Sequence, residues 1–249
     1  MASRDGIIKF CEDYLRVSEF SDGCKNGLQV EGKEEVKKIV TGVSLSQELI
    51  EKALEKGADM IMVHHGLNNS RIMEEAVQIK GFTRRRLKAL LTHDLNLAGF
   101  HLPLDAHPEI GNNISLAREF GLKNISSFDI GFIGSLEAPL KFQDFVSQVK
   151  EKLKTSVYTI SAGPDHSHRV AIISGGASPR FESALEQGAD TYISGDIREG
   201  DVRAMEESGI NFINAWHYNT ERLGVFNLGN LVAEKFGIEV EFVDIPCDV

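Results

Sequence analysis

The sequence predicts an α/β protein made of two duplicated α/β halves with mostly parallel mixed sheets. Strand-like apolar runs alternate with amphipathic segments along the chain, which is typical of a helix-covered, mostly parallel sheet. The segment Glu51–Gly66 (EKALEKGADMIMVHHG) also returns as Glu182–Ile197 (ESALEQGADTYISGDI), at an offset of 131 residues. Self-similarity at a fixed offset indicates an internal repeat.

The first half contains the following expected elements. Apolar residues at helical spacing predict a helix over residues 5–15, and the Gly-rich residues 21–32 predict a turn that ends in a short strand. A strand over residues 36–44 follows. Ser44, with Gln47 three residues later, has the spacing of a capping box, and Gly57 is a suitable C-terminal stop for the helix between them. Further strands are expected over residues 58–63 and 95–100, with a helix over residues 84–92 between them.

A second repeated segment supports the duplication. At an offset of 116, Leu95–Asp105 matches the region from Asn211 to Glu221 as a strand, a histidine, three residues and a carboxylate. The strand before the first repeat also returns, as VAIISGGAS for KIVTGVS, with a loop two residues shorter. We expect residues 1–125 and 205–249 to form one half and residues 126–204 the other.

Composition limits the possible functions. The formal net charge of −10 argues against a general nucleic-acid-binding surface, which requires clustered basic residues. No apolar run approaches the ~18 residues of a transmembrane helix. Three scattered cysteines fit a reducing compartment and no disulfide framework, so we expect a cytoplasmic protein.

The residues that bear chemistry follow the predicted strands. His64 and His65 come directly after one strand, while their counterparts in the second half are Gly195 and Asp196. Ligands of α/β sheets gather beyond the carboxyl ends of the strands. Imidazole and carboxylate together suit Zn²⁺, Mn²⁺, Fe²⁺, Co²⁺ or Ni²⁺, and a carboxylate can bridge two ions ~3.5–4 Å apart. Ordinary loop histidines fit the same dipeptide, so the pattern alone leaves both interpretations open.

Several segments resemble the GTP cyclohydrolase I type 2 family (YbgI-like proteins), and the resemblance runs from about Gly6 to Pro246. The segments are SDGCKNGLQVEG, MIMVHHGL, FHLPLDAHPEIGNN, GADTYISGDI and HYNTERLGVFNLGNLVAEKFGIEVEFVDIP. The resemblance implies two intertwined α/β/α halves, a hexameric ring and a dinuclear metal site. The ligands that it implies are His64, His65, Asp105, His217 and Glu221. His101 lies in the same motif and is implied as a partner of the ligands or as a sixth ligand.

Such a site suits hydrolysis, because two divalent ions lower the pKa of a bound water from ~15.7 toward ~7. His101 and His107 are candidates for a general acid or base. Asn26 and Gln29 are candidate substrate contacts, although Asn-Gly is also an ordinary turn. Arg85, in a run of three arginines, is a candidate phosphate contact, although such a run is usually a solvated helix face.

Three functions remain open from the sequence. The first is a metal-dependent hydrolase of the GTP cyclohydrolase kind, acting on a nucleotide-like substrate. The second is another metallohydrolase, such as a phosphoesterase. The third is a non-catalytic metal-binding ring that binds a partner.

Overall fold

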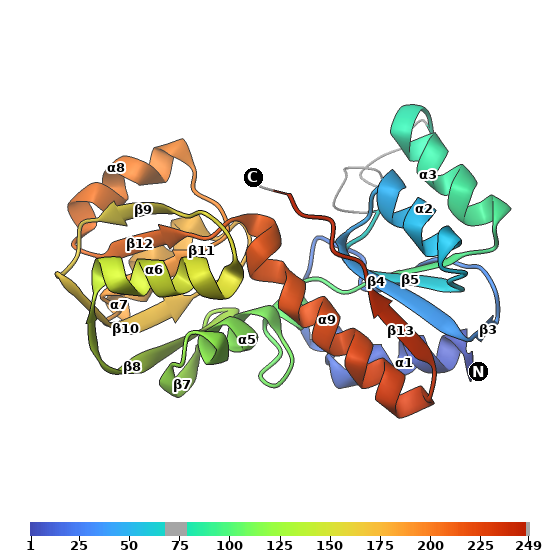
Figure 1. The fold of residues 1–249 in the computed structure, drawn as a ribbon, viewed down its shortest axis with the longest axis horizontal. Coiled ribbons are helices and arrows are strands. Elements are labelled where there is room, and N and C mark those ends of the chain that lie inside the picture. Colours follow the sequence, from blue (N-terminus) through green and yellow to red (C-terminus); the bar gives the residue numbers. More distant parts are fainter. Residues whose placement is uncertain (68–78, 248–249) are drawn as a thin grey trace. The chain divides into compact units, whose positions relative to one another are not determined.

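The chain folds into two compact units (Figure 1). The computed structural model describes residues 1–67 and 79–247. Unit 1 comprises Met1–Leu104 and Gly224–Ile245, and unit 2 comprises Asp105–Leu223 together with the C-terminal residues from Pro246. Because the chain leaves unit 1, builds unit 2 and returns, the predicted intertwining of two α/β halves is confirmed.

The elements of unit 1 up to the first crossing are β1 (Ala2–Ser3), α1 (Arg4–Tyr14), the 3-10 turn η1 (Val17–Glu19), β2 (Gly27–Val30), β3 (Glu35–Val36), β4 (Lys38–Ser44), α2 (Gln47–Glu55), β5 (Met60–His65), α3 (Gly81–Thr92), β6 (Asn96–Gly99) and α4 (Leu102–Asp105). After the return, unit 1 contains the larger part of α9 (His217–Phe236) and β13 (Glu239–Phe242).

The elements of unit 2 are α5 (Asn112–Glu119), β7 (Lys123–Phe128), β8 (Gly131–Lys141), α6 (Phe142–Leu153), β9 (Tyr158–Ser161), β10 (His166–Ile172), the 3-10 turn η3 (Ser178–Arg180), α7 (Phe181–Glu186), β11 (Thr191–Ser194), α8 (Glu199–Ser208), β12 (Asn211–Asn214) and the first turns of α9.

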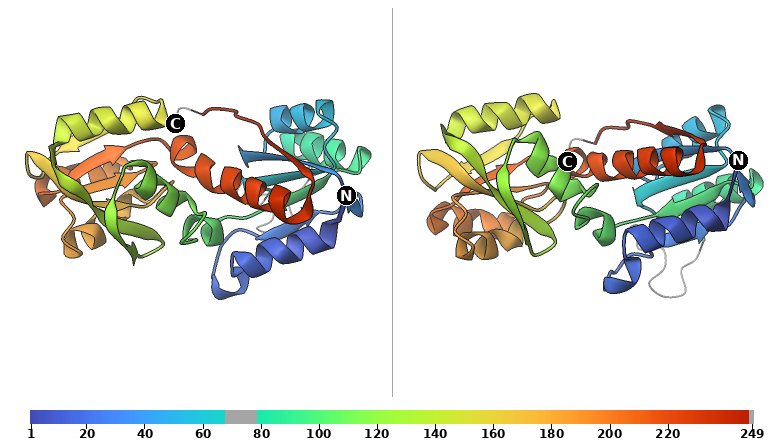
Figure 2. Two further views of the ribbon diagram at one scale, coloured as in Figure 1. Left: turned by 60° about the horizontal axis from the view of Figure 1, so that its bottom comes forward. Right: turned by 90° about the horizontal axis from the view of Figure 1, so that it is seen from below.

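Unit 1 is a sheet with helices on both faces. Among the described residues the strand order is β13-β4-β5-β6-β2. The first four strands run parallel and β2 is antiparallel to β6. Helices α2 and α3 lie on one face, and α1 and α9 lie on the other (Figures 1 and 2). The rings of Phe10 and Phe236 join α1 to α9, with centroids 5.6 Å apart.

Unit 2 has the same layered form, with a sheet order of β7-β8-β10-β11-β12-β9 among the described residues. Strands β10, β11 and β12 are parallel, whereas β7, β8 and β9 pair antiparallel, so this sheet is more mixed than that of unit 1. Val170 and Ile172 of β10 pack with α5 and α6, while Ala171 and Ile173 pack with α7 and α8. This alternation follows from the two-residue period of a strand, and Figure 2 shows α6 opposite α7 and α8.

The strand pairing confirms and refines the repeat. Ile39 pairs with Met60 in unit 1, and Val170 pairs with Thr191 in unit 2, so the offset of 131 covers both strands of the pair. The expected two-residue shortening of the intervening loop is therefore wrong. Met60 pairs next with Asn96, and Thr191 pairs with Asn211, which gives the third strand an offset of 115.

The histidine motifs match at an offset of 116, which is one residue more than the offset of 115 between the strands that precede them. By hydrogen bonding, Phe100 corresponds to Ala215, because their N–H groups donate to Val63 and Ser194 at equivalent positions. His101 therefore corresponds to Trp216, a left-handed residue with φ of 66°. His217 follows it as the first residue of α9, so the two histidine motifs match in composition but are shifted along the chain.

The repeated aspartate of the GAD sequence performs the same task in both units. In unit 1, Asp59 Oδ2 accepts hydrogen bonds from the N–H groups of Lys37 and Lys38, at 2.9 and 3.3 Å. In unit 2, Asp190 Oδ2 accepts them from His168 and Arg169, at 3.0 and 2.8 Å. Asp59 thus anchors the start of β4 and Asp190 anchors β10, in each case the strand that precedes the helix that the aspartate follows.

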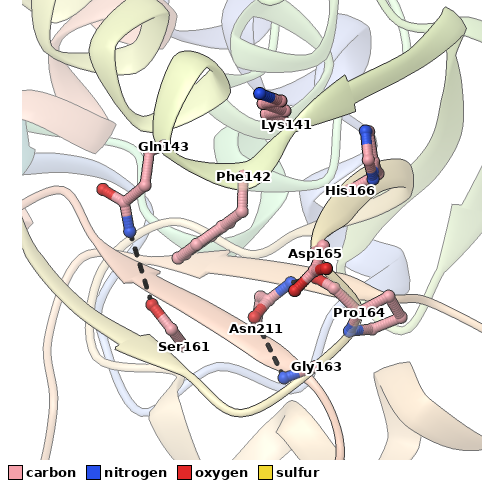
Figure 3. A pocket seen from close by; sticks show the side chains of 9 residues that line it. All are labelled: Lys141, Phe142, Gln143, Ser161, Gly163, Pro164, Asp165, His166 and Asn211. Atoms are coloured by element: carbon pink, nitrogen blue, oxygen red, sulfur yellow. Dashed lines mark hydrogen bonds between the residues drawn. The ribbon is translucent and has the colours of Figure 1, made fainter.

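A repeated asparagine closes the amino edge of each sheet. Asn96 Oδ1 accepts from Gly32 N and its Nδ2 donates to Lys33 O. Asn211 repeats both bonds, accepting from Gly163 N at 3.0 Å and donating to Pro164 O at 2.7 Å (Figure 3). A hollow of about 340 Å³ lies beside this clamp in unit 2. It is at the amino ends of β10 and β12, away from the strand ends that carry the predicted ligands.

Two sequence-based expectations differ from the structure. Ser44 is not the cap of α2, because it ends β4; Ser46 caps the helix instead, accepting from Leu49 N at 3.0 Å. The half boundaries expected at residues 125 and 204 lie inside unit 2, whose limits are Asp105 and Leu223. The reason is that α5 packs with α6 in one core, and β12 pairs with β11.

No helix among the described ranges is both long enough and apolar enough to cross a membrane.

The aspartate anchors predict a matched pair of stability effects. Asp59→Asn and Asp190→Asn are each expected to lower the free energy of unfolding by about 1–3 kcal/mol, because an amide cannot accept all the bonds of a carboxylate. Thermal or urea unfolding measures the loss. Asp13→Asn, in the exposed Lys9–Asp13 pair, is the control, with an effect within about 0.5 kcal/mol.

The Asp59 effect is also expected to depend on pH. Burial by itself would raise the pKa of Asp59, but hydrogen bonds from Lys33 and the backbone outweigh it and lower the pKa. A lowered folded-state pKa stabilises the protein above the unfolded-state value of ~3.9, and the contribution disappears as the pH falls. The difference between wild type and Asp59→Asn should therefore shrink below about pH 4; a constant difference down to pH 2 contradicts this origin.

Candidate metal centre

Three histidines meet at the carboxyl edge of the unit 1 sheet. His64 and His65 are the last residues of β5, and His101 follows β6, the parallel neighbour of β5. The ring centroids are 4.5 Å apart for His64 and His65, and 5.0 and 5.6 Å from those two rings to that of His101. One ligand nitrogen of each ring lies within 4.8 Å of the others, so the structure groups these residues as the sequence predicts.

Each of the three rings is held through Nδ1. His64 Nδ1 lies 2.8 Å from the carbonyl oxygen of Phe100, which can only accept, so this nitrogen carries the hydrogen. His65 Nδ1 lies 3.0 Å from Ser44 Oγ, and His101 Nδ1 lies 3.0 Å from Asp22 Oδ1. A partner on Nδ1 fixes the ring orientation and makes Nε2 the nitrogen for a metal ion.

Unit 2 contains two buried carboxylates and one histidine among the predicted ligands. A ligand oxygen of Asp105 lies within 4.8 Å of one of Glu221, and both residues are only 3% exposed. Asp105 Oδ1 accepts hydrogen bonds from Asn112 Nδ2 at 2.8 Å and Ser174 Oγ at 3.0 Å, which fix the carboxylate in place. His217 Nε2 lies 3.0 Å from Glu221 Oε2.

His217 also uses Nδ1 for a carboxylate. Asp196, the residue that corresponds to His65, places Oδ2 at 3.0 Å from His217 Nδ1. Burial by itself would lower the pKa of His217, but the hydrogen bonds with Asp196 and Glu221 outweigh it and raise the pKa to about 10. The imidazole therefore carries a proton at neutral pH when no other cation is near.

Glycines make room for the Glu221 carboxylate. Gly175 has a φ of 63°, and a Cβ at this position would lie 2.1 Å from Glu221 Oε1. A Cβ on Gly195 would lie 2.5 Å from Thr220 Oγ1, whose hydroxyl accepts from Gly175 N. The loops after β10 and β11 therefore approach the first turn of α9 as closely as they do only because Gly175 and Gly195 lack a side chain.

The donor set fits divalent metal ions. Two buried carboxylates within 4.8 Å of one another repel, and a divalent cation offsets this repulsion. The imidazoles are oriented through Nδ1 in the manner of metal-ligating histidines. The structure thus contains clusters of His, Asp and Glu residues able to bind metal ions, and a mixed imidazole and carboxylate set favours first-row transition metals over Ca²⁺ or Mg²⁺.

Of the other candidates from the sequence, Asn26, Gln29 and His107 make structural contacts. Asn26 is buried; its Oδ1 accepts from His101 N at 2.7 Å. Gln29 Oε1 accepts from Leu67 N at 2.7 Å, and a Cβ on Gly66 would lie 2.1 Å from the same oxygen. Arg85 is exposed on α3. His107 Nδ1 accepts from Glu109 N and Ile110 N in a turn.

Sequence reasoning missed four residues that hold the ligands: Ser44, Asp22, Asn112 and Ser174. Asp22 and Asn112 stand within motifs that also contain predicted site residues. Their proximity to those residues in the sequence could have identified them as contacts of the ligands. Ser44 and Ser174 lie at the ends of repeated strands, where the repeat itself marks an edge that carries ligands.

Fold and donor set together define the class: an α/β/α protein whose strand ends carry a His, Asp and Glu set able to bind divalent metal ions. The family model Duf34/NIF3 (NGG1p interacting factor 3) matches residues 2–248, and the chain belongs to this family. A Haemophilus influenzae protein named GTP cyclohydrolase 1 type 2 homolog is 40% identical over 237 residues, covering 93% of each chain.

Two solved structures extend the likeness to the whole fold. Protein ybgI, described as of unknown function, is 37% identical and superposes with a TM-score of 0.94 over 100% of both chains. TTHA1606 from Thermus thermophilus is 32% identical, with a TM-score of 0.91 over 100% of both chains. The expected resemblance and the mixed α/β fold are therefore confirmed.

The glycine cradle gives a matched test of the metal centre. Gly175→Ala is expected to push Glu221 from its position and reduce bound metal, because the new Cβ overlaps the carboxylate. Gly209→Ala is the control: it has the same left-handed backbone, with φ of 80°, but nothing within 4 Å of the new Cβ. Both variants carry a backbone strain of ~1–2 kcal/mol.

Elemental analysis and thermal unfolding of the two glycine variants separate strain from displacement. We expect similar melting temperatures but a lower metal content for Gly175→Ala alone. Equal metal content in both variants would show that Glu221 is not a ligand held by this cradle.

Proposed function

We propose that the protein is a dinuclear metal-dependent hydrolase resembling GTP cyclohydrolase 1 type 2, with a nucleotide-like substrate. The proposed ligands are His64, His65, Asp105, His217 and Glu221. The two divalent ions belong to the group Zn²⁺, Fe²⁺, Mn²⁺, Ni²⁺ and Co²⁺. The observation that carries the proposal is that the histidines of this set are all anchored through Nδ1, which is the usual arrangement of metal-ligating imidazoles.

The chemistry that such ions supply when bound is a lowered pKa of water, and hence a nucleophile at neutral pH. The chain's own groups orient the substrate and move protons. We assign proton transfer to Nε2 of His101, because its Nδ1 is held by Asp22. Asn26 and Gln29 are proposed to border the substrate, since their amides hold the loops beside His101 and Leu67. Arg85 is proposed to contact a phosphate group.

The first test is metal content. Purified wild-type protein is expected to hold at least about one divalent ion per chain, and the double variant His64→Ala/His65→Ala is expected to lose it. His93→Ala, which removes an exposed imidazole at the end of α3, should keep it. Less than about one ion in wild type, or no loss in the double variant, contradicts the proposed centre.

The second test is activity. Metal-loaded protein incubated with GTP is expected to release formate or a pterin product, and His101→Gln is expected to lower the rate by about 10²–10⁴-fold. Activity on phosphate esters and none on GTP would favour a phosphoesterase that uses the same ligands. No turnover of either, with a lower melting temperature for His65→Ala, would favour a non-catalytic metal-binding protein.

We also propose a cytoplasmic homohexameric ring, on the strength of the family resemblance. Light scattering of the purified protein is expected to give about six times the chain mass of 27.5 kDa. A monomer at micromolar concentration would contradict this assembly.

A further inference from the structure

Asp22 is a heavily engaged carboxylate of unit 1. Its side chain is 4% exposed. Oδ1 accepts from His101 Nδ1 at 3.0 Å and from Cys24 N at 2.9 Å, and the same ring nitrogen lies 3.2 Å from Oδ2. Oδ2 accepts from Leu102 N at 3.0 Å and from Asn26 Nδ2 at 2.9 Å. One buried carboxylate therefore gathers four donors from two segments that are about 79 residues apart in the chain.

The bond to the ring has a consequence that the backbone bonds do not have. An ionised carboxylate accepts and does not donate, so Nδ1 of His101 must carry the hydrogen. Burial would raise the pKa of Asp22, but hydrogen bonds from His101 and Asn26 outweigh it and hold the pKa well below its usual range. Asp22 therefore stays ionised across the physiological range, and His101 keeps the Nδ1–H form, with Nε2 as its basic nitrogen.

We propose that Asp22 is a positioning residue that fixes the tautomer and orientation of His101, so that Nε2 of this ring serves the His64–His65 edge. A role of Asp22 in catalysis rests on the proposed function. The tautomer of His101 does not depend on that function. The ring of His101 lies 5.0 and 5.6 Å, between centroids, from those of His64 and His65. Carboxylates that hold an imidazole in this way set its tautomer and basicity.

The alternative is that Asp22 only shapes the turn of residues 21–26. In that case its necessary partners are Cys24 N, Leu102 N and Asn26, and the ring of His101 is incidental. Loss of Asp22 would then loosen the loop without any specific change in the protonation of one imidazole nitrogen. The two roles differ in a property that can be observed directly.

Asp22→Asn is the informative substitution, because an amide has one acceptor and one donor end. With its oxygen at the Oδ2 position, it still serves Leu102 N and Asn26 Nδ2, and its NH₂ meets one donor, Cys24 N. With its oxygen at the Oδ1 position, the NH₂ opposes both Leu102 N and Asn26 Nδ2. The first arrangement has fewer donor–donor conflicts. It places the NH₂ group at the nearer position, 3.0 Å from Nδ1 of His101, and the oxygen at the farther one, 3.2 Å away. His101 should therefore change to the Nε2–H form.

The experiment uses full-length, metal-free protein labelled with ¹⁵N at histidine, at a pH where His64 and His101 are neutral. Long-range ¹H–¹⁵N correlation spectra report which ring nitrogen is protonated. His101→Gln assigns the His101 signals by their absence. Wild type is expected to show Nδ1–H for His101, and Asp22→Asn is expected to show Nε2–H. His64, whose Nδ1 donates to Phe100 O, should be unchanged in both and is the internal reference.

Asn26→Ala is the control for loop loosening. It removes the hydrogen bond that Asn26 Oδ1 accepts from His101 N and the one that Asn26 Nδ2 donates to Asp22 Oδ2, but it leaves the carboxylate on Nδ1. It is expected to lower the melting temperature while His101 stays Nδ1–H. If Asp22→Asn also leaves His101 in the Nδ1–H form, or if wild type is already Nε2–H, the proposal is overturned.

Metal affinity provides a second readout and separates this proposal from the proposed function. Titration of Co²⁺, followed by its visible absorption, is expected to show about 10–100-fold weaker binding to Asp22→Asn than to wild type. A tautomer change in a protein that binds no Co²⁺ supports the positioning role and contradicts the metal centre. Unaltered Co²⁺ affinity and absorption after a confirmed tautomer change would overturn the link between Asp22 and the His64–His65 edge.

Discussion

Parallel pairing of neighbouring strands is the constraint on which the rest of this structure depends. Strands that run in the same direction finish at the same edge, so residues distant in sequence become neighbours there without any dedicated contact. In unit 1 the ends of β4, β5 and β6 bring Ser44, His65 and His101 to one edge. In unit 2 the ends of β10, β11 and β12 bring Gly175, Asp196 and His217 together in the same order.

The two edges show how a duplicated unit acquired two kinds of chemistry on one scaffold. The anchors of the sheet were retained, as Asp59 and Asp190 make the same strand contacts. The residues beyond the strands differ: where unit 1 has His65, unit 2 has Asp196, and this carboxylate turns toward an imidazole from α9. The residues that anchor the strands are the same in both units, whereas the residues that could bind a metal ion differ between them.

Features that depend on residues close together in the chain can be predicted from the sequence, whereas contacts between distant residues cannot. The repeat, the alternating elements and the histidine pair follow from local patterns, and the structure has them. The prediction of Ser44 as the helix cap is wrong because two serines, Ser44 and Ser46, precede the helix. Only the length of β4, which includes Ser44, decides which of them is the cap. The contact of Asp22 with His101 spans 79 residues and leaves no periodic trace. The one-residue shift between the two histidine motifs, which places Trp216 where the first unit has His101, becomes visible only when the hydrogen-bond registers of the two sheets are compared.

The return of the chain to unit 1 has a consequence for biosynthesis. Strand β13 pairs with β4 and is formed by Glu239–Phe242, close to the C-terminus. During translation, all of unit 2 up to Leu223 leaves the ribosome before β13 does. Residues 105–223 of unit 2 are therefore available for folding first, while β4 presents an unpaired edge to other chains. The strand that ends at Ser44 pairs with β5 from the start but gains its second neighbour, β13, only after residues 105–223 have been synthesised, so termination before β13 would leave the histidine edge on an incomplete sheet.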